Sequence, residues 1–124
     1  MWLALRFVVL LLMASALGFA GIWQGALVDS KCYSAMERNM NPTDTTTYVD
    51  RDLRHEILYC SPSSKTRFFG VVQRDGVSFA FDSAGNQKAA ELIRVNGKRS
   101  IFVVAIVGEI ANKVIQVDSV LAAK

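Results

Sequence analysis

The sequence predicts a small, mainly β domain with some α. Its core is a five-stranded barrel, with a helix between strands three and four and a second helix or long loop between strands one and two. Three observations lead to this prediction. An Asp-Gly pair lies between two runs of β-branched and aromatic residues over 68–82, which is a strong hairpin signal. A helical pattern separates that hairpin from two further apolar runs near the C-terminus. One more strand pattern and both cysteines precede it.

Residues 1–21 have the composition of an export signal. Arg6 is the only charged residue among them, and an apolar run occupies 7–20. Small residues follow at positions that suit a signal peptidase. These are Gly18 and Ala20, or alternatively Ala14 and Ala16. The other interpretation is an uncleaved inner-membrane anchor over 7–23, a length at the lower limit of about 17–25 residues for a spanning helix. We expect cleavage, because the second half of the run is rich in Ala and Gly.

Removal of 1–21 leaves 22–124, which is long enough for one domain with one hydrophobic core. The loss of Arg6 leaves 13 basic against 11 acidic residues, a net charge of +2. A balance so close to neutral gives no strong attraction to nucleic acid or to anionic lipid. We therefore expect contact with a membrane only through the signal segment, if that segment is retained.

The first half of the predicted domain contains a strand, a loop and a short helix. Alternation of side chains predicts a strand over 22–29, and the polar, threonine-rich composition of 34–47 predicts a long loop. Apolar residues at helical spacing predict a helix over 48–59. Cys60 and Pro62 follow the helix, and proline disfavours helix at the residue before it.

Cys32 and Cys60 are the only two cysteines, and in an exported protein they are most simply one disulfide. Closing the chain between them would stabilise the fold by roughly 3–4 kcal/mol in the chain-entropy model. The alternative is a redox pair, or a metal site that adds His55. The cysteines lack the Cys-x-x-Cys spacing of redox sites, and irregularly spaced ligands form a weak metal signature. His55 lies in a charged helical segment, so we expect it at the surface.

The hairpin is predicted to turn through a two-residue type I′ loop at Asp75-Gly76. That turn would set Val72 opposite Phe79 and Gly70 opposite Phe81. Alternation would then divide the side chains between two faces. One face would hold Phe68, Val72, Val77, Phe79 and Phe81, and the other would hold Phe69, Val71, Gln73, Ser78, Ala80 and Asp82.

The C-terminal part is predicted as a helix followed by two strands. A turn over 83–86 precedes a helix over 87–95, which Asn86 would cap and Gly97 would end. An apolar run predicts a buried strand over 101–107. A loop over 108–113 would connect it to a last strand over 114–121.

Five strands with a helix between the third and fourth is the element order of an oligonucleotide/oligosaccharide-binding (OB) barrel. Three stretches resemble a family of small secreted bacterial domains of unknown function with OB-like barrels. They are Gly25-x-Leu27-Val28-Asp29-Ser30-Lys31-Cys32, Cys60 before the hairpin, and Val117-Asp118-Ser119-Val120. Family members often carry another cysteine soon after the position of Cys60, whereas this chain has Ser61-Pro62-Ser63-Ser64, leaving one bridge. The resemblance implies a fold and an exported location, and no activity.

OB barrels commonly bind ligands across strands two and three and the adjoining loops. The residues that would do so here are Lys65, Arg67, Phe69, Val71, Gln73 and Arg74. Aromatic and cationic side chains can bind single-stranded nucleic acid, but export and the small net charge argue against it. A small ligand, a glycan or an envelope protein fits better. A pocket lined by Arg67 and Arg74 with an exposed Phe69 would favour binding, and a flat, charge-mixed surface would favour a structural or interaction role.

The sequence contains no pattern typical of an enzyme. There is no Gly-rich phosphate loop and no nucleophile elbow around any serine. Asp29 and Asp82 could form a carboxylate pair, but both follow predicted strands, where aspartate more often caps a turn. We therefore predict a non-enzymatic, cofactor-free, ligand- or partner-binding domain of the cell envelope. The alternatives are a purely structural or interaction protein, and the Cys/His metal or redox site.

Overall fold

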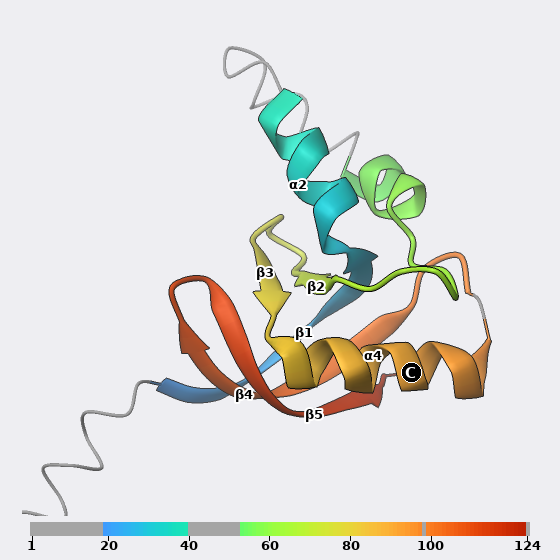
Figure 1. Cartoon of the computed structure of the whole chain (residues 1–124). Helices are drawn as coiled ribbons and strands as arrows, with labels where there is room; N and C mark the ends of the chain where they lie inside the picture. The colour runs from blue at the N-terminus through green and yellow to red at the C-terminus, as the bar shows by residue number, and fades with distance from the viewer. Residues whose placement is uncertain (1–18, 40–52, 98, 124) are drawn as a thin grey trace, which may run out of the picture.

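The computed structural model describes residues 19–39, 53–97 and 99–123, and its chain is shown in Figure 1. The strands form a closed barrel in the order β1-β2-β3-β5-β4, which confirms the predicted OB-like fold class. The strands are β1 (Phe19–Asp29), β2 (Phe69–Val72), β3 (Ser78–Phe81), β4 (Val103–Ala111) and β5 (Val114–Ala122). The helices are α2 (Ser30–Asn39), α4 (Ser83–Asn96) and a described segment over 53–59.

Strand β1 closes the barrel because it pairs with two neighbours. Its first part pairs with β4 over Phe19–Ala26, and its last part pairs with β2 over Ala26–Asp29. The parallel pairing of β3 with β5 completes the ring. The strand begins at Phe19, three residues before the predicted start at Ile22. The rest of the predicted signal segment lies outside the described residues, so its cleavage stays a prediction.

The predicted hairpin exists, but its register was wrong by one residue. Val71 pairs with Phe79 and Val72 with Ser78, instead of Val72 with Phe79. The turn is a three-residue loop, in which Gln73 N–H donates to Val77 O and Gly76 N–H donates to Gln73 O. Only Gly76 has positive φ, at 87°, which is typical of a type I turn followed by a glycine bulge and not of type I′.

The type I′ geometry occurs instead between β4 and β5. Here the predicted loop over 108–113 was wrong, because the two strands extend to Ala111 and Val114. The connection is the pair Asn112-Lys113, with φ of 53° and 63°. Positive φ at both central residues gives the twist that a two-residue hairpin loop requires. The sequence did not indicate this turn, because neither residue is the glycine that usually marks a type I′ turn.

A helix replaces the first part of the predicted loop over 34–47. Helix α2 begins directly after β1, where the Asp29 carboxylate accepts a hydrogen bond from Cys32 N–H at 3.1 Å. This is the N-cap geometry that satisfies an otherwise unpaired donor at the helix start. The remainder of that loop, and the first part of the helix predicted over 48–59, lie outside the described residues; 53–59 is helical as predicted.

Helix α4 begins four residues earlier than predicted, because Asp82 caps it instead of Asn86. The Asp82 carboxylate accepts from Gly85 N–H at 2.9 Å, and Gly97 ends the helix as predicted. The side-chain oxygen of Asn86 instead accepts from Phe69 N–H at 2.9 Å. Asn86 therefore fastens the start of β2 to the helix.

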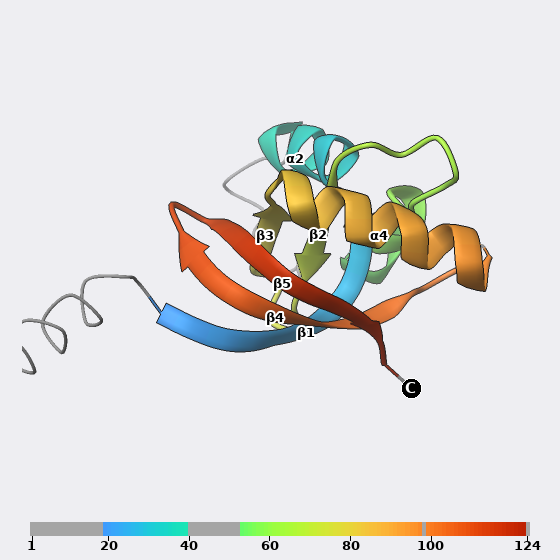
Figure 2. The ribbon, with the colours of Figure 1, turned by 60° about the horizontal axis from the view of Figure 1, so that its bottom comes forward.

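Two apolar clusters hold the domain together. The larger fills the barrel and includes Phe69, Ile106 and Ile115, with Ala89 and Ile93 of α4 closing one end. Figure 2 shows α4 lying along β5, and Figure 1 shows α2 and 53–59 above β2 and β3, with α4 below them. The smaller cluster joins Val28 and Val72, on the outer side of the barrel, to residues of α2 and 53–59. Among the described ranges, no helix has the length and apolar composition required to cross a bilayer.

Candidate functional site

The outer surface of β1 and β2 is covered by α2 and the segment 53–59, which we call the helical cap. Val28 and Val72 are both 1% exposed and pack with Tyr33 and Cys60. The predicted disulfide between Cys32 and Cys60 is present and joins the two parts of the cap. The cap therefore occupies part of the surface that OB barrels use for ligands.

Two of the six predicted ligand-binding residues are inside the barrel. Phe69 and Val71 are 1% and 0% exposed, because the one-residue change in register directs them inward. Gln73 is half-buried at the hairpin, and Arg74 is exposed at its turn. Lys65 and Arg67 are also exposed. In this stretch the exposed aromatic side chain is that of Phe68, which is 44% exposed. If the alternation had been assigned with Phe69, Val71, Phe79 and Phe81 on the inner face, Phe68 would have been predicted at the surface.

Arg67 and Phe68 line a groove of about 560 Å³ between the segment 66–68 and the first half of α4. We call it the Arg67 groove. Helix α4 contributes Ser83, Asn86, Gln87 and Ala90 to its lining. The ammonium group of Lys31 lies 4.1 Å from the centroid of the Phe68 ring, a cation–π distance. The groove thus combines an exposed aromatic ring with the cation Arg67, and Lys31 of α2 lies over that ring.

The residues on both sides of Arg67 in the chain are held by hydrogen bonds. Thr66 Oγ1 lies 3.5 Å from the Asp29 carboxylate, to which it donates. Ser30 N–H donates to Phe68 O at 3.0 Å, and Phe69 N–H is held by Asn86 at 2.9 Å. Because its neighbours are bonded to three different elements, the backbone of Arg67 has a defined position at the groove.

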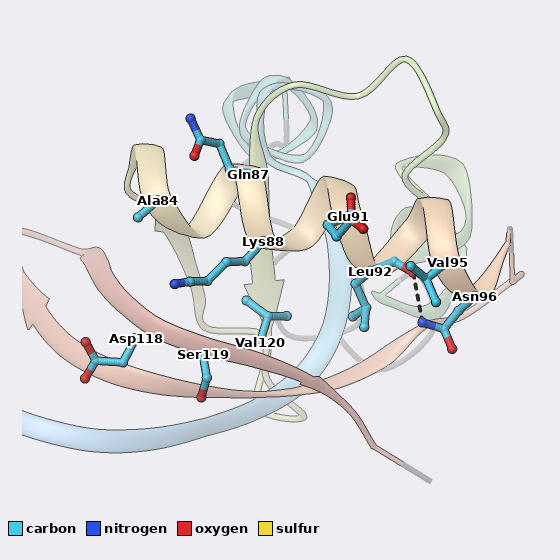
Figure 3. Close-up of a pocket in the computed structure, with 10 residues that line it drawn as sticks. All are labelled: Ala84, Gln87, Lys88, Glu91, Leu92, Val95, Asn96, Asp118, Ser119 and Val120. Carbon is cyan, nitrogen blue, oxygen red and sulfur yellow. Dashed lines mark hydrogen bonds between the residues drawn. The ribbon is translucent and has the colours of Figure 1, made fainter.

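A second groove, of about 570 Å³, lies on the other side of α4 against β5. Figure 3 shows Leu92 pointing from α4 toward β5 and Val120 pointing back toward the helix, while Gln87 points away from β5. Lys88, Glu91 and Asp118 also line this α4–β5 groove, so it carries charges of both signs. It is a groove and not the flat, charge-mixed surface that would favour a structural or interaction role.

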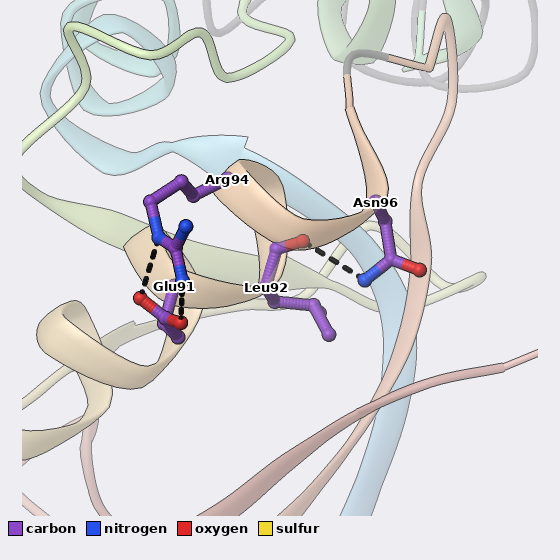
Figure 4. Close-up of polar contacts among 4 residues, drawn as sticks. All are labelled: Glu91, Leu92, Arg94 and Asn96. Atoms are coloured by element: carbon purple, nitrogen blue, oxygen red, sulfur yellow. Dashed lines mark hydrogen bonds and ion pairs between the residues drawn. The ribbon is translucent and has the colours of Figure 1, made fainter.

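The C-terminal half of α4 is stabilised by its own polar contacts (Figure 4). Arg94 donates to both carboxylate oxygens of Glu91, and this hydrogen bonding lowers the pKa of the Glu91 carboxyl. Asn96 Nδ2 donates to Leu92 O at 2.9 Å. Glu91 is therefore engaged by a cation on its own helix.

The two aspartates considered as a carboxylate pair are both helix caps. Asp29 accepts from Cys32 N–H in α2. Asp82 accepts from Gly85 N–H in α4 and, at 3.2 Å, from Val117 N–H in β5. Each carboxylate satisfies backbone donors at the end of a strand, which is the structural role that aspartate commonly has there.

The helical cap contains a buried tyrosine and an exposed histidine. Burial, with Glu37 and Glu56 nearby, raises the pKa of Tyr33 to about 12. His55 is exposed as expected, whereas Glu56 is buried. Within 19–39, 53–97 and 99–123, no three His, Cys, Asp or Glu side chains are grouped as a metal site would require, and both cysteines are consumed by the disulfide.

Comparisons with protein-family models, with curated proteins and with solved structures found no match for this chain. The fold and the site define it as a small, disulfide-bonded β-barrel domain with two surface grooves beside α4. Its function therefore has to be argued from these grooves.

Proposed function

We propose that the protein is an exported, non-enzymatic binding domain of the cell envelope, and that the Arg67 groove is its ligand site. The groove is the observation that carries the proposal. Its volume of about 560 Å³ lies within the roughly 300–1,000 Å³ typical of small-molecule sites. The groove also presents the exposed Phe68 ring together with the Arg67 side chain.

The proposed location is supported by the disulfide. Disulfides persist in oxidising compartments such as the periplasm and the extracellular space, and are rare in the cytosol. The apolar composition of 7–20 supports the same location. The non-enzymatic part of the proposal is supported by the structural use of the best chemical candidates, since Asp29 and Asp82 cap helices and Cys32 and Cys60 are bonded.

Export is tested by the intact mass of the protein recovered from a bacterial envelope fraction, alkylated with and without prior reduction. We expect a processed chain whose two thiols react only after reduction. A chain beginning at Leu17 retains all of β1, whereas one beginning at Gly21 loses two residues that pair with β4. A full-length chain in the membrane fraction would contradict cleavage, and thiols that react without reduction would contradict an oxidised bridge.

Binding is tested by photo-crosslinking from the exported protein in its source organism. A photoreactive residue at Gln87, which lines both grooves, should form a defined adduct with a ligand or envelope component. The same residue at Lys113, in the β4–β5 turn, is the control. If neither position forms an adduct although both variants are exported and folded, the domain has a structural role instead.

A further inference from the structure

We infer that the Arg67 groove selects a ligand that carries a carboxylate next to a ring. This inference rests on the proposed function, because it names the chemistry recognised by the same groove. It starts from the charges. Arg67 lines the groove, Lys31 contacts the Phe68 ring, and Lys65 is two residues before Arg67. Arg67 therefore lies in the groove and Lys31 beside it, so two cations from two segments adjoin one site.

The carboxylates described near this groove are already engaged. Asp29 accepts hydrogen bonds from Thr66 and from the start of α2. Asp82 accepts from backbone groups of α4 and β5. Glu91, one turn after Gln87 on α4, is paired with Arg94. These hydrogen bonds hold the Asp29 and Asp82 carboxylates in place without removing their charge. Among the described residues no carboxylate forms an ion pair with Arg67, so its guanidinium is available to an anionic group of a ligand.

Arginine favours a carboxylate over a compact anion. Its planar guanidinium can donate two parallel hydrogen bonds to the two oxygens of a carboxylate. The backbone of Arg67 is already held through its neighbours Thr66 and Phe68, so less conformational freedom is lost when a ligand binds. This arrangement favours recognition of a planar group in one orientation.

Phe68 supplies the contact for the ring. Its side chain is 44% exposed, and Lys31 occupies a position over the ring. Ala90 and the buried Phe81 also line the groove. Aromatic pairs in offset or edge-to-face contact attract each other beyond the effect of the area they bury. A ligand ring can therefore pack on Phe68 while its carboxylate reaches Arg67.

Two kinds of ligand have this chemistry, namely aromatic acids and glycans that contain uronic acids. The exported, disulfide-bonded protein would be titrated with 2-naphthoate and with trigalacturonate, followed by amide chemical-shift changes. The uncharged counterparts are 2-naphthol and maltotriose. We expect the carboxylate of the preferred pair to bind at least 5-fold more tightly than its uncharged counterpart, with the largest shifts at Arg67, Phe68 and Ala90.

Variants then assign the effect to the groove. Arg67→Ala should weaken carboxylate binding about 5- to 10-fold, and Arg67→Lys should restore only part of it, because lysine lacks the bidentate fork. Arg74 was also predicted from the sequence to bind the ligand, but it lies at the hairpin turn and does not line the groove. Arg74→Ala is therefore the matched control, since it removes an equally charged, exposed arginine and should change binding less than 2-fold. Phe68→Ala should weaken both the charged and the uncharged member of the pair.

Several results would overturn the inference. Equal affinity for carboxylate and uncharged probes would exclude selection by charge. If Arg67→Ala and Arg74→Ala weakened carboxylate binding equally, the loss of affinity would be explained by the net charge of the protein and not by the groove. Shifts confined to the α4–β5 groove would place binding elsewhere, and no binding of either carboxylate at millimolar concentration would exclude this ligand class. Shifts confined to the α4–β5 groove would also overturn the assignment of the ligand site to the Arg67 groove. Failure of both carboxylates to bind would overturn the inference alone, and the Gln87 crosslinking test, which does not depend on ligand chemistry, would still decide the proposed binding function.

Discussion

Removal of the disulfide should destabilise the domain strongly and should release the helical cap before the barrel. Cys32 and Cys60 are 28 residues apart. In the chain-entropy model, closing a loop of that length lowers the conformational entropy of the unfolded chain by about 12 cal/mol/K. This stabilises the folded state by about 3.6 kcal/mol at 25 °C. A domain of this size is stable by about 5–15 kcal/mol in total. The disulfide therefore contributes a large fraction of the free energy of unfolding of the domain.

The magnitude is measured by urea unfolding of the double variant Cys32→Ala/Cys60→Ala, followed by tryptophan fluorescence. With a slope of about 1–1.5 kcal/mol/M for a small domain, the midpoint should fall by roughly 2.4–3.6 M. The reduced wild type is the control. It retains both sulfur atoms in the apolar cluster beneath the cap, so its loss of stability reports loop closure without the cavity that alanine leaves.

Hydrogen exchange locates the effect. Amides of α2 should lose protection in the double variant, because the cap meets the barrel mainly through the small cluster around Val28 and Val72. Amides of β4 and β5 should exchange only through global unfolding. A change in unfolding free energy below about 1 kcal/mol, or equal loss of protection in the cap and the barrel, would refute this reasoning.

Three further substitutions test other parts of the fold. Asp82→Ala should cost about 2 kcal/mol of unfolding free energy, since it leaves backbone donors of α4 and β5 unsatisfied, whereas Asp75→Ala, in the exposed hairpin turn, should cost less than about 1 kcal/mol. Gly25→Ala should cost more than about 2 kcal/mol, because its Cβ would lie 2.2 Å from a β2 carbonyl oxygen, and Gly21→Ala in the same strand should be tolerated, since the nearest atom is 3.4 Å away. Finally, the pKa of Tyr33 is raised in the folded state, so folding favours the protonated phenol. This contribution to stability is complete at pH values below the usual tyrosine pKa of about 10, and it is lost as the pH rises toward 12. Urea unfolding should therefore show about 1.4 kcal/mol less stability at pH 11 than at pH 9, and Tyr33→Phe should remove that part of the pH dependence.

Much of the fold could be predicted from local signals. Alternating and continuous apolar runs located all five strands, and the helical pattern with Gly97 located α4 and its end. Two cysteines beside an export-like segment predicted the bridge, which is present. The exposure of Lys65 and Arg67 was also predictable, because they belong to a polar stretch without a strand pattern. Each of these inferences depends on neighbours within a few positions in the chain.

Tertiary contacts decided the features that local patterns left open. Asp75-Gly76 is compatible with either a two- or a three-residue hairpin loop, and burial of Phe69 in the barrel selected the second. Asp82 and Asn86 are both good N-caps, but Asn86 is used by Phe69 N–H, 17 residues away. That bond only forms once β2 has packed against α4.

The candidate site shows the same division. The sequence indicated which residue types could bind a ligand. It did not indicate that Arg67 and Phe68 line one groove with Ser83, Gln87 and Ala90 of α4. A register change of one residue moves every side chain of a strand to the opposite face, so it exchanged Phe69 for Phe68 at the surface. The sequence by itself determined the elements, their order and the disulfide, because these follow from local composition and from the small number of cysteines. The register, the caps and the groove were decided only in the tertiary structure, because they depend on which buried surfaces meet when distant segments pack.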